Sequence, residues 1–313
     1  YKAYTAIVPE LQFYNGYGGF DMDGQEYVIK LQPGQNTPLP WINVITNGSF
    51  GFQVSEAGGG YTWAENSREN KLTVWSNDPI TDPLSEVIYL RDEGTGDFWS
   101  ATPQPIKTNN DFVVRHGFGY SVFESANLGI AHSLTVFTPL KDSIKLKVLR
   151  IKNTSKKTRS LSIYSYIRPV MGVAEQSNAQ YIFTKTHESG AVLAMNGYNN
   201  DFPDRILFLD SSIPHASITG DRKEFLGANG SLREPAALHK KALSGNVGAG
   251  MDPCCSLQDI IELAPGKEQT IIIMLGQASD EGQVKKISSR YKSAGRCKQE
   301  LDEVKKYWRD ILT

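Results

Sequence analysis

Three of the five tryptophans lie in one polar stretch, residues 41–83, whose residue types suit the binding of a sugar. Trp41, Trp63 and Trp75 are interspersed there with carboxamides, carboxylates and arginine. An aromatic ring can lie against the C–H face of a pyranose while amides and carboxylates bind its hydroxyl groups. We therefore predict a carbohydrate-binding surface with these candidate contacts: Tyr61, Trp63, Arg68, Glu69, Asn70, Asn77 and Asp78.

The glycines at positions 58–60 would let the backbone approach a ligand or a neighbouring strand closely. We predict that Trp41 and Trp75 lie in the core. For Tyr61 and Trp63, which follow the glycines, a core position and a site position fit equally well. His116 follows an arginine in a second polar, aromatic patch and is a further candidate for substrate contact. The alternative for His116 is a strand histidine whose ring is bound by the backbone.

Catalytic residues are not predicted in this chain. Cleavage of a glycosidic bond needs a carboxylic acid at the leaving oxygen and a second carboxylate opposite it. The alternative for Glu65 and Glu69 is ion pairing with the arginine and lysine beside them. Acid–base chemistry on one sugar ring needs a histidine and a carboxylate that converge there, for which only His116 with Glu124 or Glu69 is available. The stretch offers five carboxylates whose spacing selects no pair: Glu56, Glu65, Glu69, Asp78 and Asp82.

The other chemistry-bearing residues point away from metals and cofactors. The five histidines include no pair at ligand spacing, and no phosphate-binding or zinc motif is present. Residues 21–24 resemble the start of a calcium loop, but the acidic ligand expected at the twelfth position is replaced by Gln32. We predict neither a metal site nor a cofactor.

Composition excludes several classes of partner. The net charge of the 313-residue chain is -1, which gives no electrostatic basis for binding nucleic acid or an anionic membrane. No apolar run approaches the ~18 residues of a membrane span, and no signal peptide opens the chain.

Cys254, Cys255 and Cys297 fit no disulfide framework, so buried thiols in the reducing cytoplasm are predicted. The chain starts without methionine and is expected to be a piece of a longer protein. Association of that longer protein with the inner membrane is left open by the sequence.

Period-2 patterns predict a chain made mainly of β-strands. In residues 144–148, isoleucine, leucine and valine alternate with Lys145 and Lys147, which indicates a strand with one solvent-facing side. Many such segments joined by short turns predict two antiparallel sheets packed face to face. The predicted strands are 26–31, 86–91, 97–100, 112–116, 120–124, 133–138, 144–148, 161–167, 191–195, 206–209 and 269–275.

Two later segments depart from the strand pattern. Residues 211–258 are less regular, and within them 221–226 fit a short helix or a turn. Asp280 and Glu281 mark a helix start, and apolar residues then recur at three- and four-residue steps as far as Ile311. This apolar stripe either folds back on the sheets or forms a linker to another domain. We divide the chain into a β-domain, residues 1–277, and linker helices, residues 278–313.

Four ordered motifs carry a further signal. The longest is PWINVITNGSFGFQVSEAGGGYTWAENSRENKLTVWSNDPITDP at 40–83, and the others are HGFGY at 116–120, FLGANGSL at 225–232 and LSGNVGAGMDPC at 243–254. Together they resemble the N-terminal region of the inverting glycoside phosphorylases of glycoside hydrolase family 94, formerly glycosyltransferase family 36. The resemblance runs from about residue 15 to the final helix. It is greatest to cyclic β-1,2-glucan synthases and 1,2-β-oligoglucan phosphorylases.

The resemblance implies a large β-supersandwich like that of galactose mutarotases, followed by linker helices. In the family an (α/α)6 barrel comes next and carries the catalytic acid and the phosphate site, so no catalytic residue carries over to this chain. A β-glucan oligosaccharide is the implied ligand, with the barrel of the same parent chain and a homodimer as partners. The expected role is to support the active site with a loop from residues 41–83. A stand-alone glucan-binding module and a mutarotase-type epimerase are the alternatives.

Overall fold

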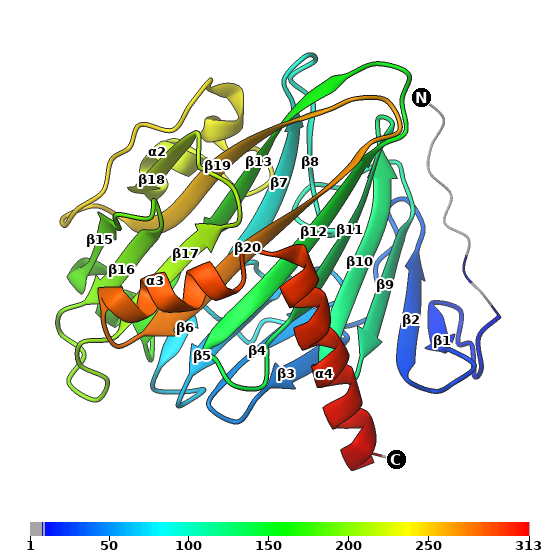
Figure 1. Ribbon diagram of the computed structural model, residues 1–313, viewed down its shortest axis with the longest axis horizontal. Coiled ribbons are helices and arrows are strands. Elements are labelled where there is room, and N and C mark those ends of the chain that lie inside the picture. The colour runs from blue at the N-terminus through cyan, green and yellow to red at the C-terminus, as the bar shows by residue number, and fades with distance from the viewer. Residues whose placement is uncertain (1–7, 9, 313) are drawn as a thin grey trace.

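Two packed layers of antiparallel strands make up the protein in the computed structural model, which describes residues 8 and 10–312 (Figure 1). One layer is a single ten-stranded sheet, here called the large sheet. Its order in space differs from chain order because β20 lies between β12 and β17. The strands in spatial order are β1 (Gly18–Phe20), β2 (Glu26–Leu31), β9 (Phe112–Gly117), β10 (Tyr120–Asn127), β11 (Ile130–Phe137), β12 (Ile144–Asn153), β20 (Glu268–Ala278), β17 (Ile206–Ser211), β16 (Val192–Asn196) and β15 (Ile182–Thr186).

The second layer is divided into two five-stranded sheets. The β13 sheet consists, in spatial order, of β18 (Ser217–Asp221), β19 (Pro253–Leu263), β13 (Arg159–Ile167), β7 (Glu86–Asp92) and β8 (Phe98–Ser100). The β5 sheet consists of β14 (Pro169–Gly172), β6 (Lys71–Thr73), β5 (Gly60–Ala64), β4 (Phe50–Ser55) and β3 (Ile42–Thr46). The predicted, mainly β architecture is confirmed, but with three sheets in place of two. The division falls at Arg168, where the next residue, Pro169, lacks the N–H that a continuous ladder needs.

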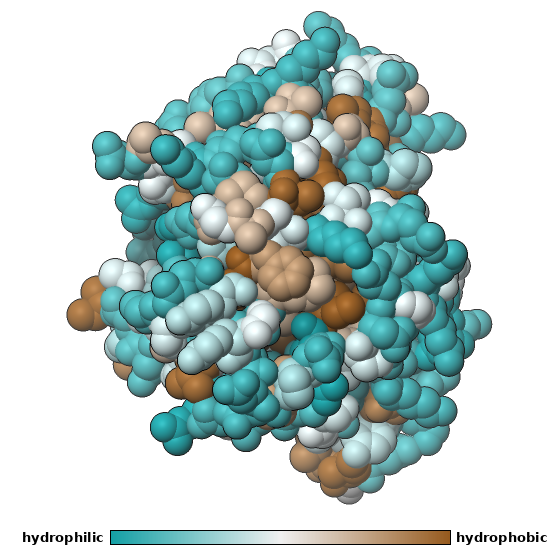
Figure 2. Space-filling view, turned by 90° about the vertical axis from the view of Figure 1, so that its left-hand side faces the viewer, coloured by the Kyte–Doolittle hydropathy of each residue, from teal (hydrophilic) through white to brown (hydrophobic). Residues whose placement is uncertain are grey.

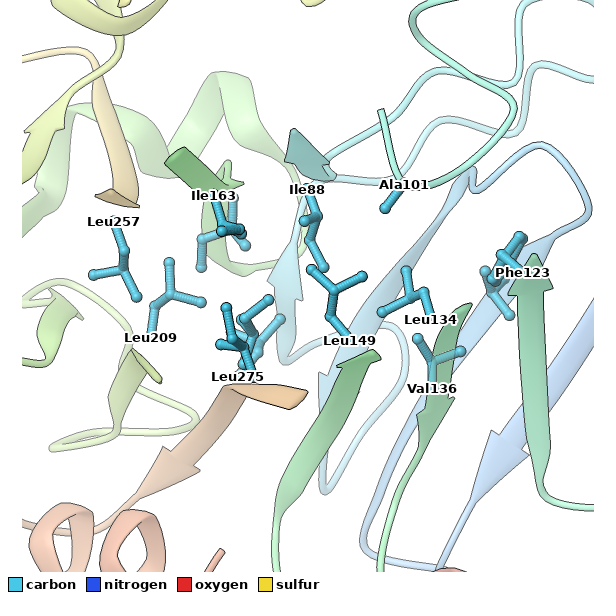
Figure 3. Close-up of a cluster of buried hydrophobic side chains, with 14 of the residues drawn as sticks. Ile88, Ala101, Phe123, Leu134, Val136, Leu149, Ile163, Leu209, Leu257 and Leu275 are labelled. Atoms are coloured by element: carbon cyan, nitrogen blue, oxygen red, sulfur yellow. The ribbon is translucent and has the colours of Figure 1, made fainter. Parts of the chain in front are cut away.

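The main hydrophobic core lies between the layers and contains side chains from all three sheets. Figure 3 shows Leu149 and Leu275 of the large sheet pointing towards Ile88 and Ile163 of the β13 sheet. Phe52 of the β5 sheet belongs to the same cluster and is fully buried. Each such side chain contributes about 1.5–3 kcal/mol through burial. Shared burial therefore holds both parts of the second layer against the large sheet.

The interior also holds charges that the sequence pattern placed in solvent. Lys145 and Lys147 of β12 are each 5% exposed, so the predicted solvent-facing side of this strand is wrong. Their ammonium nitrogens lie 3.0 and 2.7 Å from Oε2 of Glu86 on β7. Glu86 also accepts hydrogen bonds from the hydroxyl groups of Thr62 and Thr73. These two lysines can be buried because Glu86, on the β13 sheet, supplies the opposite charge. This side of β12 therefore faces the interior.

Helices cover the outer face of the large sheet (Figure 1). α3 (Glu281–Arg290) begins after its N-cap Asp280, and α4 (Ala294–Leu312) follows across the sheet. Val304 of α4 is buried against the strands, whereas Ile311 is 55% exposed. The apolar stripe thus folds back on the sandwich along most of α4. No helix in the part of the chain that the structure describes has the length and apolar character of a membrane span.

The outer face of the β13 sheet is covered as well. α2 (Arg222–Leu226), capped by the Asp221 carboxylate, and the 3-10 helix η2 (Ala236–His239) contribute to a buried cluster there. The ring of Phe225 stacks on that of Tyr166, with centroids 4.7 Å apart. Of the two alternatives for residues 221–226, the structure contains the helix.

The outer face of the β5 sheet is the exception, because the hydrophobic clusters of the described residues include no layer over it. Val44 of β3 is 60% exposed there, and Trp75, which follows β6, is 38% exposed. α1 (Glu175–Asn178) and the 3-10 helix η1 (Ala179–Tyr181) connect β14 of this sheet to β15 of the large sheet. An exposed apolar sheet face is a common place for a ligand or partner to bind.

Candidate functional site

The tryptophan-rich stretch is not a single loop, because strands β3 to β6 of the β5 sheet lie within it. Side chains alternate between the two faces of a strand. Thr62 and Ala64 of β5 are fully buried on the interior side, so Tyr61 and Trp63 lie on the outer side. The expected loop is therefore corrected: Tyr61 and Trp63 lie on the face of a sheet.

Trp63, Tyr61 and Trp75 form a line across this face, which we call the aromatic row. The ring centroid of Tyr61 lies 5.2 Å from that of Trp63 and 5.1 Å from that of Trp75. Tyr61 is buried between them, and its hydroxyl donates to the carbonyl oxygen of Ser67 at 3.1 Å. Trp75 thus belongs to the outer face and not to the core, contrary to the sequence interpretation. Trp41 packs against the main core, as expected.

Gly51 of β4 makes room for one end of the row. It lies opposite Trp63 in the β4–β5 ladder, and a Cβ added to Gly51 would be 2.6 Å from Cζ2 of that indole. Gly51→Ala is therefore expected to displace the ring and to lower the free energy of unfolding by about 1–3 kcal/mol. Urea denaturation measures the stability, and near-ultraviolet circular dichroism reports the indole environment.

The matched control is Gly295→Ala, because a Cβ at Gly295 would meet only Oγ of Ser293 at 3.7 Å. This control is expected to cause no destabilisation. A Gly51→Ala variant with wild-type stability and a wild-type near-ultraviolet spectrum would show that Trp63 does not lie across Gly51.

A cleft of about 310 Å³ adjoins the row at Trp75. Its walls come from β6 and the loop after it, from residues 83–85 just before β7, and from the segment that follows β13. Within it, the Arg168 guanidinium pairs with Glu175, and Nζ of Lys71 donates to the carbonyl oxygen of Val173 at 2.8 Å. Burial lowers the pKa of Lys71. An indole face beside fixed donors and a carboxylate has the chemistry needed to bind a ring rich in hydroxyl groups.

Four predicted contacts lie on exposed turns around the row. Arg68 and Glu69 pair at 3.5 Å in the β5–β6 turn, and Asn77 is exposed in the loop after Trp75. Asp78, in the same loop, accepts a hydrogen bond from the Thr81 hydroxyl at 2.7 Å, which lowers the pKa of its carboxyl. Arg68 and Asn77 are exposed, whereas Glu69 and Asp78 are half-buried.

Of the two acidic residues in the β5–β6 turn, only Glu69 forms the ion pair expected from the sequence. Glu69 has the expected partner, Arg68. Glu65 instead binds Arg205 through both oxygens, at 2.8 and 3.1 Å from the guanidinium nitrogens. Arg205 lies just before β17, so this ion pair ties the end of β5, the central strand of the β5 sheet, to the large sheet.

Two predicted contacts are bound within the fold. Asn70 is 1% exposed, and its Nδ2 donates to the carbonyl oxygen of Ala64 at 2.8 Å. His116 lies on β9, with Nδ1 2.8 Å from Oγ of Ser121 and Nε2 3.0 Å from the carbonyl oxygen of Trp41. Burial lowers the pKa of His116 to about 4. Both ring nitrogens of His116 are therefore hydrogen-bonded within the fold, as in the alternative of a structural histidine on a strand. His116 also lies outside the aromatic row.

Arg168 and Glu175 were not among the residues predicted from the sequence. The structure brings them to the cleft from the segment after β13, about ninety residues from Trp75 in the chain. One local signal was present, because Arg168 interrupts an otherwise apolar and aromatic run at 166–171. The distance in sequence hid its relation to the row.

Comparison with known proteins identifies the class of domain to which this fold belongs. Residues 25–294 match the family described as "Glycosyl hydrolase 94, supersandwich domain". The chain therefore belongs to this family, and the resemblance carried by the four sequence motifs is confirmed. The supersandwich predicted from that resemblance is confirmed with it.

Particular relatives are longer proteins. The cyclic beta-(1,2)-glucan synthase NdvB of Rhizobium meliloti (strain 1021) is 36% identical over 311 residues, which cover 96% of this chain and 11% of that protein. The N,N'-diacetylchitobiose phosphorylase of Vibrio furnissii is 28% identical over 300 residues, which cover 93% of this chain and 37% of the enzyme. The chain thus spans well under half the length of these relatives.

Solved structures show the same fold at low sequence identity. A bacterial glucoamylase complexed with acarbose matches with a TM-score of 0.52 and 10% identity, over 96% of this chain and 40% of that one. A putative kojibiose phosphorylase from the human microbiome matches with a TM-score of 0.51 and 10% identity, over 94% and 38% of the two chains.

Proposed function

We propose that this chain is the non-catalytic N-terminal sandwich domain of a glycoside phosphorylase or cyclic β-1,2-glucan synthase. Its aromatic row and cleft hold a β-glucan. The observation that carries this proposal is that the β5 sheet leaves its outer face uncovered among the described residues and places Trp63, Tyr61 and Trp75 on it beside a polar cleft. The relatives named for a glucan and for a chitobiose support a saccharide ligand.

In this proposal the chemistry takes place on a neighbouring (α/α)6 barrel of the same parent chain. The parent enzyme transfers glucosyl units between a β-glucan and phosphate with inversion, and phosphate is the nucleophile. Residues 278–313 serve as linker helices towards the barrel. Ile311 and Leu312 support such a contact because they are 55% and 54% exposed at the end of α4. We further propose a homodimer as the assembly.

The cysteines support a reducing compartment such as the cytoplasm as the location of this domain. Cys254, Cys255 and Cys297 are all free and buried. Burial raises the pKa of each of these thiols, which keeps them in the less reactive protonated form.

Isothermal titration calorimetry with a linear β-1,2-gluco-oligosaccharide tests the binding role. Trp75→Ala is expected to weaken binding about tenfold, because the exposed indole at the mouth of the cleft is lost. The matched control is Tyr307→Ala on α4, which removes an aromatic side chain that is 45% exposed and lies outside the row. Absence of binding by the wild type at millimolar ligand, or wild-type affinity in Trp75→Ala, would contradict the proposal.

The same preparation tests the assignment as non-catalytic. Incubated with β-1,2-glucan in phosphate buffer, the chain is expected to release no glucose 1-phosphate. Release at a rate above the buffer control would mean that the chain itself carries catalytic residues.

A further inference from the structure

A pair of exposed aromatic rings, separate from the aromatic row, lies on the face of the molecule that carries β15 and β16. Tyr181, at the end of η1, and Tyr198, just after β16, stack with ring centroids 4.4 Å apart and planes inclined by 18°. They are 38% and 65% exposed, and we call them the tyrosine platform. Figure 2 shows this face, with hydrophobic side chains gathered near its centre and hydrophilic ones around them. Phe183 of β15 adds an exposed ring to the same strand edge.

Hydrogen bonds fix the loop that carries Tyr198. The side chain of Asn196 accepts from the backbone N of Tyr198 and donates to Oδ1 of Asn178, both at 3.0 Å. Asn196 and Asn199 also donate to the carbonyl oxygen of Met171, at 3.0 and 3.1 Å. Because these bonds hold the loop in place, little conformational entropy is lost when a ligand lies on the ring.

Neutral amides are among the side chains that border the platform in sequence. Gln180 precedes Tyr181, Asn200 follows Tyr198 by two positions, and both are exposed. A flat hydroxyl-bearing ring pair with neutral donors and acceptors beside it suits a neutral polyhydroxyl ligand better than an acidic peptide or a nucleic acid.

One short helix connects the platform to the cleft. Glu175 and Gln176, at the start of α1, line the cleft beside Trp75. Asn178, at the end of α1, holds the Tyr198 loop through Asn196. A four-residue helix is only about 6 Å long. The cleft and the platform are therefore neighbouring surfaces on either side of α1.

We propose that the tyrosine platform is a second subsite for β-glucan, which a chain bound in the cleft reaches when it is long enough to pass α1. This inference rests on the proposed function of the cleft and adds a dependence on chain length. A disaccharide occupies the cleft alone, whereas a long glucan contacts both surfaces.

Calorimetric titrations of the chain with two probes, sophorose and a linear β-1,2-glucan, test the platform. Tyr198→Ala is expected to weaken binding of the glucan about fivefold to tenfold and to leave binding of sophorose unchanged. Tyr198→Phe keeps the ring and is expected to retain most of the glucan affinity. Tyr14→Ala is the matched control, because Tyr14 is a 59% exposed tyrosine near the N-terminus.

The two probes separate binding at the platform from binding in the cleft. Wild-type glucan affinity in a Tyr198→Ala variant with a native circular dichroism spectrum overturns the platform but leaves Trp75-dependent binding intact. Equal weakening for both probes also overturns it, since the substitution then acts through the cleft. Tyr198-dependent binding of the glucan without any binding of sophorose supports the platform and counts against the cleft. Should Tyr198→Ala fail to fold, Tyr181→Ala makes the same comparison.

Discussion

Glu86→Ala is expected to lower the free energy of unfolding by about 3–5 kcal/mol, because it leaves two ammonium groups buried without a counterion. The side chains of Glu86, Lys145 and Lys147 are only 6–7% exposed. Burial alone would raise the pKa of Glu86, but the two lysines hold it well below its usual range. The carboxylate is therefore charged at all but strongly acidic pH, and its removal leaves an excess of buried positive charge.

Urea denaturation of Glu86→Ala beside Glu281→Ala tests this expectation. Glu281 pairs with Lys185 at 2.7 Å, but both side chains are about half exposed, so its loss should cost no more than about 1 kcal/mol. The triple variant Glu86→Leu, Lys145→Met, Lys147→Met removes all three charges and should recover most of the lost stability. A change below about 1 kcal/mol in Glu86→Ala would mean that solvent reaches the two lysines.

Protonated His215 is expected to contribute about 3 kcal/mol to stability, and this contribution is expected to be lost as pH rises through the titration of His215. This histidine lies between two buried carboxylates, with Nδ1 2.7 Å from Oδ1 of Asp259 and Nε2 3.2 Å from Oδ1 of Asp210. Nζ of Lys292 is 3.7 Å from the other oxygen of Asp210. Burial would lower the pKa of His215, but the hydrogen bonds and charges of the two aspartates raise it to about 9.

The sign follows from the raised pKa. The native state binds the proton more tightly than the unfolded chain, whose histidine pKa is near 6.5. The stabilisation is complete below pH 6.5 and is lost as pH rises through about 9. Lys145 acts in the opposite direction at higher pH, because burial lowers its pKa to about 8. The test is therefore the difference in pH dependence between the wild type and His215→Gln.

Over the range from about pH 6 to pH 10, the wild type should lose about 3 kcal/mol more stability than His215→Gln. His239→Gln removes a histidine whose side chain is 54% exposed and serves as the matched control. Identical pH dependence in the wild type and His215→Gln would show that the two aspartates do not stabilise the protonated imidazole of His215. A histidine titration by nuclear magnetic resonance checks the pKa directly.

Strand positions were predictable because alternation along a strand is a local property. Predicted strands 112–116 and 161–167 lie within β9 and β13. The same alternation misplaced Lys145 and Lys147, since the charge that makes their side an interior one, Glu86, lies on a strand about sixty residues away. Local patterns thus predicted the strand and could not predict which side it buries.

The candidate site was predictable by residue type and less so by position. Tyr61 and Trp63 were singled out because aromatics beside amides have the chemistry of a sugar surface, and both lie on the outer face of the β5 sheet. Asn70 has the same chemistry, but its amide is bound under the turn, also within reach of Gln277 at 3.2 Å. Arg168 was missed because the cleft forms only when β13 and β14 bring it beside Trp75. Long-range packing decides which polar groups remain free for a ligand.

We propose that the aromatic row of the β5 sheet binds a β-glucan. Its most direct test is a titration of the isotope-labelled chain with a β-1,2-gluco-oligosaccharide, followed through the five indole N–H signals. The indole signals of Trp63 and Trp75 are predicted to shift with ligand, and that of Trp99, which is 1% exposed in the core, is predicted to stay in place. Shifts confined to the other tryptophans, or no shift at saturating ligand, would contradict the account.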